Sequence, residues 1–162
     1  MPYPSPAADV AAFRGDQIDQ PLDGSRLLAR GLVVIGLSAI AVVHLAQLPD
    51  TWRDTPGLGA LFAVLVAGSV INAVALLHSD RRRVWQAAAL VALSPIGGYL
   101  LTRSVAVPFD RDDVGNWLEL SALVALFIEL SVVALCGHTL LRARARQARN
   151  TTGYRSDQQR RP

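Results

Sequence analysis

The chain has 162 residues, of which 51% are hydrophobic and 18% charged, and this length and composition favour a single domain. Charged residues crowd both ends and three short connections, whereas four long stretches between them are nearly free of charge. This segregation is typical of an integral membrane protein. A single cysteine, Cys136, excludes an intramolecular disulfide, a cysteine-based zinc site and a CxxC redox pair.

The first segment, residues 1–26, is too polar and too interrupted by proline to bury a core, so we expect a disordered arm on the cytoplasmic side. The first apolar run starts only after Arg30 and is long. A secretory signal would have a shorter apolar stretch nearer the start, with a small-residue cleavage site. We therefore expect this run to be retained as a membrane span.

Four apolar runs follow one another, each close to the ~20 residues that a helix needs to cross a hydrocarbon core. They are apolar on all sides, whereas a soluble helical bundle would show a polar outer face. The sequence therefore predicts an all-α fold, a four-helix transmembrane bundle over residues 27–141, and a basic tail over residues 142–162. The predicted spans are residues 31–48, 57–77, 84–102 and 117–141.

The distribution of arginine, which supplies every Lys or Arg position of the chain, predicts the orientation of the helices in the membrane. The second connection, at residues 80–83, has a net charge of +2, and the tail from Arg142 onward has a net charge of +6. The first and third connections are each net −1. Because basic residues near membrane ends prefer the cytoplasmic side, we predict a multi-pass protein of a bacterial plasma membrane with both termini in the cytoplasm.

The two glutamates of the chain, Glu119 and Glu129, lie on one face of the fourth predicted span. Glu129 lies about 18 Å from the outer edge, and an ionisable group at that depth indicates a functional site. Asn72, about 22 Å into the second span, is the partner that depth matching selects for Glu129. His44 and Arg103 lie near the outer face with Glu119. The expected site therefore has His44, Arg103 and Glu119 at its mouth and Asn72 and Glu129 at its floor.

Structural roles compete with this hypothesis. Glu129 is equally explained as a protonated carboxyl that holds two helices together by hydrogen bonding to Asn72 or a serine. A hydrogen bond from His44 and an ion pair from Arg103, both to Glu119, are better explained as structural contacts. A metal site stays open, because one histidine with carboxylates could hold a divalent ion, but neither His-x-x-x-His nor Glu-x-x-His occurs. The sequence does not identify a metal or a cofactor.

Several of these residues belong to a longer pattern of spaced residues in the sequence. The pattern joins His44-x4-Pro49, Trp52, Pro56-x2-Gly59-x2-Phe62, Arg103-x4-Pro108-Phe109, Glu119 and Glu129. It resembles an uncharacterised family of small four-helix integral membrane proteins of actinobacteria, over residues 27–141. The resemblance implies a membrane location and a recurring polar set, and it implies no reaction.

Two functions of different classes fit the sequence. The first is a membrane protein that binds a small polar solute, a cation or a proton at an outward-facing intramembrane site. The second is a non-catalytic accessory or assembly subunit of a larger membrane complex, and homo-oligomerisation is a further expectation. The sequence leaves open whether the protein is an enzyme and favours a non-enzymatic role, since ligands for a redox cofactor are not evident. The arginines of the tail indicate contact with anionic lipid headgroups and not with nucleic acid.

Overall fold

The protein is described here by a computed structural model that covers residues 24–105, 115 and 117–159. Four helices make up this part of the chain. They are α2 (Gly24–Asp54), α3 (Pro56–His78), α4 (Arg82–Ser104) and α5 (Leu120–Gln159). The predicted arm over residues 1–26 lies outside the described residues except for its last three, which begin α2.

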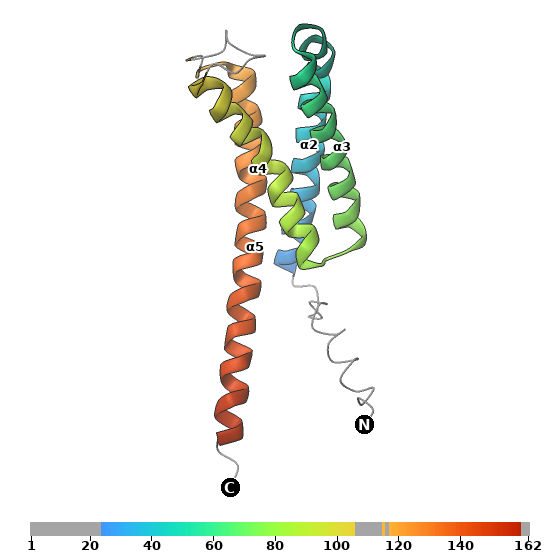
Figure 1. Ribbon diagram of the computed structural model, residues 1–162. Coiled ribbons are helices and arrows are strands. Elements are labelled where there is room, and N and C mark those ends of the chain that lie inside the picture. The colour runs from blue at the N-terminus through green and yellow to red at the C-terminus, as the bar shows by residue number, and fades with distance from the viewer. Residues whose placement is uncertain (1–23, 106–114, 116, 160–162) are drawn as a thin grey trace, which may run out of the picture.

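Each helix contains a stretch that is long and apolar enough to cross a membrane, which confirms the predicted all-helical, four-span architecture. The helices run alternately up and down, so that α2 begins and α5 ends at the same end of the bundle (Figure 1). We call this the terminal end and the other the loop end. Towards the loop end, the pair α2 and α3 diverges from the pair α4 and α5 (Figure 1).

Two helices extend well beyond their predicted spans. The apolar run of the first span ends at Leu48, but α2 continues through Pro49 to Asp54, because a proline late in a helix removes one backbone donor without ending the helix. Helix α5 continues to Gln159 and extends past the other three helices at the terminal end (Figure 1). The fourth predicted span starts at residue 117, whereas α5 starts at Leu120.

A proline also lies inside α4, where Pro95 has no N–H to donate to the carbonyl oxygen of Val91. The hydroxyl of Ser94 donates to that same oxygen at 2.8 Å. Within a membrane an unpaired carbonyl is costly, and a neighbouring serine is a known substitute donor. This side-chain bond lets α4 continue through Pro95 without an unsatisfied backbone group.

The packed core lies in the half of the bundle nearer the terminal end. Trp85, in the first turn of α4, is fully buried in this core, and its indole N–H donates to Asp80 at 2.6 Å. Asp80 also pairs with Arg26 of α2 at 2.9 Å, and Arg30 donates to the carbonyl oxygen of Leu77. The buried cluster consists of Val33, Leu37, Ile40, Leu65, Ala73, Leu76, Trp85, Ala88, Ala92, Val132 and Cys136.

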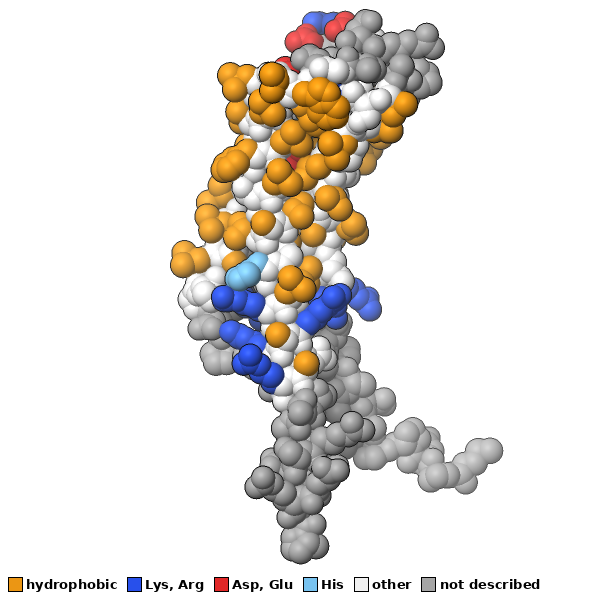
Figure 2. Space-filling view, turned by 90° about the vertical axis from the view of Figure 1, so that its left-hand side faces the viewer, with side chains coloured by type: hydrophobic (Ala, Val, Ile, Leu, Met, Phe, Trp, Pro, Cys, Tyr) orange, Lys and Arg blue, Asp and Glu red, His pale blue; other side chains and the backbone are white. Residues whose placement is uncertain are grey.

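The outside of the bundle is apolar over the spans and basic at the terminal end. Figure 2 shows hydrophobic side chains over the upper part of one face and arginines gathered below them. Large apolar side chains point outward from all four helices; Ile35, for example, is 66% exposed and Phe127 is 74% exposed. Such a surface is suited to lipid as the solvent.

Candidate functional site

The most buried pair of ionisable side chains among the described residues joins α2 to α5. His44 Nε2 lies 3.7 Å from Glu129 Oε1, and both side chains are buried, with 7% and 2% of their surfaces exposed. The distance is within ion-pair range but too long for a direct hydrogen bond. The other ring nitrogen, His44 Nδ1, lies 3.0 Å from the carbonyl oxygen of Ile40. A nitrogen facing a carbonyl oxygen must carry hydrogen, so Nδ1 is protonated and Nε2 is the nitrogen that faces the carboxyl group.

This pairing differs from the one expected from the sequence, where Asn72 was the partner of Glu129 and His44 lay at the mouth. The reason is the extension of α2 to Asp54. His44 lies ten residues before that end, about 15 Å along the helix, and Glu129 lies nine residues after Leu120, about 14 Å. The two side chains therefore have the same depth.

Asn72 lies deeper, sixteen residues or about 24 Å from the start of α3 at Pro56. Its amide donates to the carbonyl oxygen of Gly68, one turn earlier in the same helix, at 2.8 Å. The structure therefore does not bring Asn72 to the other four predicted site residues.

Close packing of two helices places the histidine against the glutamate. A Cβ atom built on Gly36 of α2 would collide with the side chain of Val132 of α5. Small residues at such positions let membrane helices approach closely. Val132 follows Glu129 by almost one turn, and Gly36 precedes His44 by about two turns. On the other side of His44, the edge of its ring meets Phe62 of α3, with ring centroids 4.8 Å apart at 79°. The imidazole is thus held between α3 and α5.

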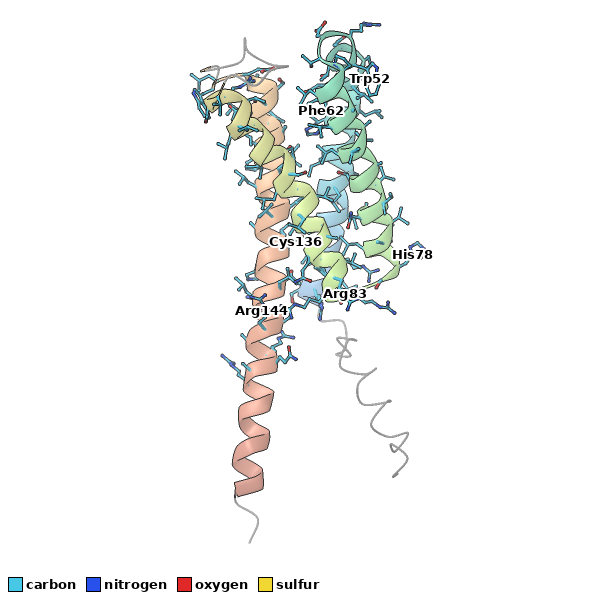
Figure 3. The ribbon with its side chains drawn as sticks, in the orientation of Figure 1. Trp52, Phe62, His78, Arg83, Cys136 and Arg144 are labelled. Carbon is cyan, nitrogen blue, oxygen red and sulfur yellow. The ribbon has the colours of Figure 1, made fainter. Side chains whose placement is uncertain are left out.

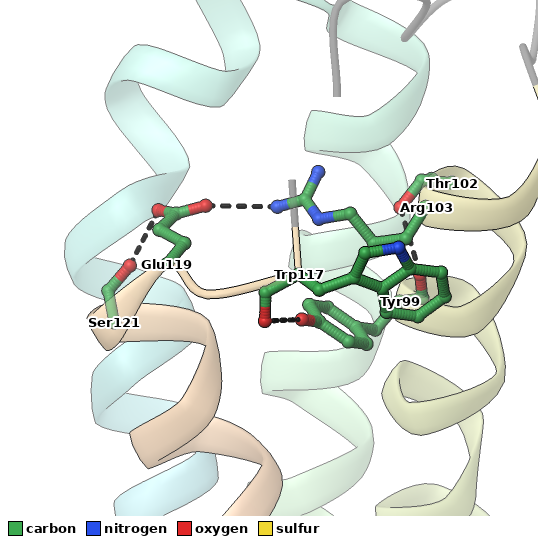
Figure 4. A network of polar contacts seen from close by, with 6 residues as sticks. All are labelled: Tyr99, Thr102, Arg103, Trp117, Glu119 and Ser121. Carbon is green, nitrogen blue, oxygen red and sulfur yellow. Dashed lines mark hydrogen bonds and ion pairs between the residues drawn. The ribbon is translucent and has the colours of Figure 1, made fainter. Parts of the chain in front are cut away.

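A second polar group ties the last turn of α4 to the start of α5 (Figure 4). Arg103 Nη2 donates to Glu119 Oε2 at 2.9 Å, and Ser121 donates to the other carboxylate oxygen at 2.7 Å. The Arg103 guanidinium lies over the ring of Tyr99, 5.2 Å from its centroid. Tyr99 in turn donates to the carbonyl oxygen of Trp117 at 2.8 Å. Arg103 is buried, whereas the Glu119 side chain is 46% exposed, so this group lies between the bundle interior and its surface.

Both polar groups line one cavity of about 580 Å³ in the half of the bundle nearer the loop end. All four helices contribute to its wall, which includes His44, Arg103, Glu119 and Glu129. Four of the five predicted site residues therefore share one cavity, and Asn72 is not part of its lining. A cavity of this size with a few convergent polar groups is typical of a small-molecule site.

Sequence reasoning did not assign site roles to Tyr99, Phe62 or Gly36. Tyr99 lies near the end of α4, where its hydroxyl donates to the carbonyl oxygen of Trp117. Nothing in the sequence distinguishes Gly36 from the other glycines of the spans. In the structure, a Cβ built on Gly36 would collide with Val132, whereas one built on Gly31, Gly97, Gly98 or Gly137 would meet nothing within 4 Å. Only the helix packing separates the glycine that matters from those that do not.

Within the described parts of the chain, no group of three His, Cys, Asp or Glu side chains lies close enough to bind a metal ion. The donors that do converge are one imidazole and one carboxyl group, which are suited to holding and exchanging a proton.

No protein-family model matches the chain, and neither a curated protein nor a solved structure shows significant similarity to it. Membership of the actinobacterial family therefore stays a prediction. The function has to be argued from the cavity and the residues that line it.

Proposed function

We propose that this membrane protein binds a proton or a cation at the His44–Glu129 pair, in a cavity that opens towards the outer face of a bacterial plasma membrane. One observation carries the proposal: a buried imidazole and a buried carboxyl group lie 3.7 Å apart on the wall of that cavity. With Nδ1 committed to Ile40, the remaining proton is held either on Nε2 or on the carboxyl group. A site with two alternative positions for one proton is a unit of proton exchange.

Burial makes a purely structural role for the pair expensive. Taking two ionisable groups out of water costs several kcal/mol each, and apolar residues of similar size often stabilise a helix interface as well or better. Ionisable residues inside membrane bundles accordingly mark pathways and relays. A purely structural contact would not need space beside the pair, and the cavity provides such space.

Among the described residues around the cavity, the His44–Glu129 pair is the group whose charge can change. Helix α4 contributes Arg103 and Tyr99, and the Arg103 charge is balanced by Glu119. Helix α2 contributes His44 itself. The one titratable residue of α3, His78, lies at the terminal end, away from the cavity. Among the described residues that line the cavity, gain or loss of a proton at the His44–Glu129 pair therefore changes the net charge.

Arginine placement supports an outward-facing cavity and cytoplasmic termini. At the terminal end, Arg83 and Arg144 lie at the same level, with His78 nearby, whereas Trp52 and Phe62 lie towards the loop end (Figure 3). The described arginines at the terminal end are Arg26, Arg30, Arg81, Arg82, Arg83, Arg142, Arg144, Arg146 and Arg149. At the loop end, the described arginines are Arg53 and Arg103, and each pairs with a carboxylate. Under the positive-inside rule, this distribution supports a cytoplasmic location for the terminal end.

Infrared difference spectroscopy on the protein in lipid nanodiscs tests proton binding directly. We expect a carboxylic acid band that disappears as the pH rises, that is missing from Glu129→Gln and that persists, shifted, in Glu129→Asp. Ser131→Ala, half a turn away on α5, is the matched control and should leave the band unchanged. A Glu129 band that does not change over the whole titration would mean a permanently neutral, structural carboxyl and would refute the proposal.

Gentle extraction at native expression level tests the competing class. Mass spectrometry of the purified material should find the protein alone or with copies of itself. A stoichiometric partner protein, together with a Glu129→Gln variant that assembles normally, would instead identify an accessory subunit.

A further inference from the structure

The wall of the cavity is mostly apolar between its two polar groups. Outside the His44–Glu129 pair and the Arg103–Glu119 group, large hydrophobic side chains make up much of its surface. They include Leu58, Leu61, Phe62, Val64, Leu65, Val91 and Leu126. A small hydrated ion would leave this surface unused, whereas a molecule with an apolar body would cover it and gain free energy from doing so.

The same cavity opens sideways between α3 and α4. These helices approach each other at Gly68, where an added Cβ would lie 3.6 Å from Val91. From there towards the loop end the two helices diverge (Figure 1). Leu61 and Val64 of α3 line the cavity and are also 58% and 71% exposed on the apolar exterior.

Helix α4 borders the same opening with small residues. Ser94 and Gly98 line the cavity and are exposed, and a Cβ built on Gly98 would meet nothing within 4 Å. The rim of the opening therefore lies on the surface that faces lipid, and a molecule dissolved in the bilayer can reach the cavity without passing through water.

We propose that the ligand is an organic cation with an apolar body, which enters from the lipid between α3 and α4 and pairs with Glu129. This inference rests on the proposed function of the His44–Glu129 pair and names the class of cation. Charge complementarity favours a cation, because among the described residues that line the cavity Arg103 pairs with Glu119, and the other carboxyl group is that of Glu129. Binding leaves Glu129 as a carboxylate paired with the cation, and the proton that the His44–Glu129 pair had held is released to solution.

Tetraphenylphosphonium is a suitable probe, and tetraphenylborate is its control of matched shape and opposite charge. With the protein in nanodiscs, we expect saturable binding of the phosphonium with release of protons into a weakly buffered solution. Glu129→Gln should weaken binding more than about tenfold, since removing one partner of a buried charge pair is costly, and Ser131→Ala should not. Equal binding to the wild type and Glu129→Gln, or equal binding of the borate, would overturn the proposal.

The route is tested separately with a pair of glycine variants. Gly98→Phe places a large side chain in the opening and should slow phosphonium binding, whereas Gly137→Phe, in open space on α5 away from the cavity, should not. Unchanged rates in Gly98→Phe would refute entry between α3 and α4.

These results separate the two proposals. If Glu129 titrates in the infrared experiment but the phosphonium does not bind, the site holds a proton and the inference about its ligand is wrong. If Glu129 does not titrate, the proposed function itself fails.

Discussion

Gly36 and Val132 are in such close contact that a methyl group on residue 36 would collide with the Val132 side chain unless one of the two helices or that side chain shifted. Val132 is buried and β-branched, so it has little freedom to move away from an added methyl group. The contact lies about two turns from His44 on α2 and almost one turn from Glu129 on α5, and it determines how closely the two helices approach on that side of the pair.

We therefore expect Gly36→Ala to destabilise the bundle. Overpacking of a core typically costs about 1–3 kcal/mol, and the better helix propensity of alanine offsets about 1 kcal/mol of this. In a Val132→Ala background the same substitution should become neutral or stabilising, because the obstructing methyl group is gone. Unfolding of the purified protein in detergent, monitored by circular dichroism, measures both effects. Gly31→Ala, at a position with open space, is the control, and a loss of stability there equal to that of Gly36→Ala would contradict the packing explanation.

The serine before Pro95 offers a second test, of backbone satisfaction in α4. Ser94→Ala removes the hydroxyl that donates to the Val91 carbonyl oxygen and should cost about 1 kcal/mol of stability. In a Pro95→Ala background the backbone N–H is restored, so the cost should largely disappear. A double-mutant cycle of thermal unfolding gives the coupling between the two positions.

The control for that cycle is Ser38→Ala. Its hydroxyl donates to the Val34 carbonyl oxygen at 2.9 Å, an oxygen that the Ser38 amide also reaches within the regular helix. It should therefore cost less than Ser94→Ala. Equal losses at the two serines would show that the proline is not the reason for the Ser94 bond.

Asp80 links three elements at the terminal end, and its charge should matter for stability. It accepts the indole N–H of Trp85 at 2.6 Å and pairs with Arg26 at 2.9 Å, with both members of the ion pair at most one-fifth exposed. We expect Asp80→Asn to destabilise the bundle by about 1–2 kcal/mol and to change the fluorescence of Trp85. Asp50→Asn removes a pair with Arg53 in which both side chains are more than three-quarters exposed, and it should have almost no effect. Equal effects would refute the role assigned to burial.

Topology can be measured by labelling introduced cysteines in intact cells. Cys136 is fully buried and should not react, and Cys136→Ala provides the background. In that background Gly57→Cys, at the loop end, should react with a membrane-impermeant maleimide, and Ser79→Cys, at the terminal end, should react only after permeabilisation. The reverse pattern would place the termini outside and the cavity on the cytoplasmic side.

Much of the architecture follows from hydropathy alone. Four apolar runs of nearly membrane length, separated by charged connections, were enough to predict an all-helical bundle with four candidate spans, and the structure confirms it. The Arg103–Glu119 contact was also expected, because both residues lie at helix ends on the same face of the bundle and short connections keep such ends together.

The pairing of Glu129 with His44 was not predictable in this way. The apolar run of the first span ends at Leu48, whereas α2 ends at Asp54. Because of these six additional residues, His44 lies at the depth of Glu129 and not at the mouth of the expected site. Depth matching from the sequence selected Asn72 for Glu129, yet in the structure Asn72 lies deeper and its amide bonds within its own helix. A depth estimate counts positions along one helix, whereas contact between two side chains also depends on how their helices are rotated and spaced relative to each other.

The sequence by itself determined that this chain forms four apolar helices and that Glu119, Glu129 and His44 lie within or beside the apolar spans, because the cost of burying charge in a membrane can be assessed residue by residue along the chain. Tertiary structure decided which of those groups meet, and it decided that they meet beside a cavity. The physical reason is that contacts between helices depend on close packing at a few positions, such as Gly36 against Val132, which no property of either residue alone reveals.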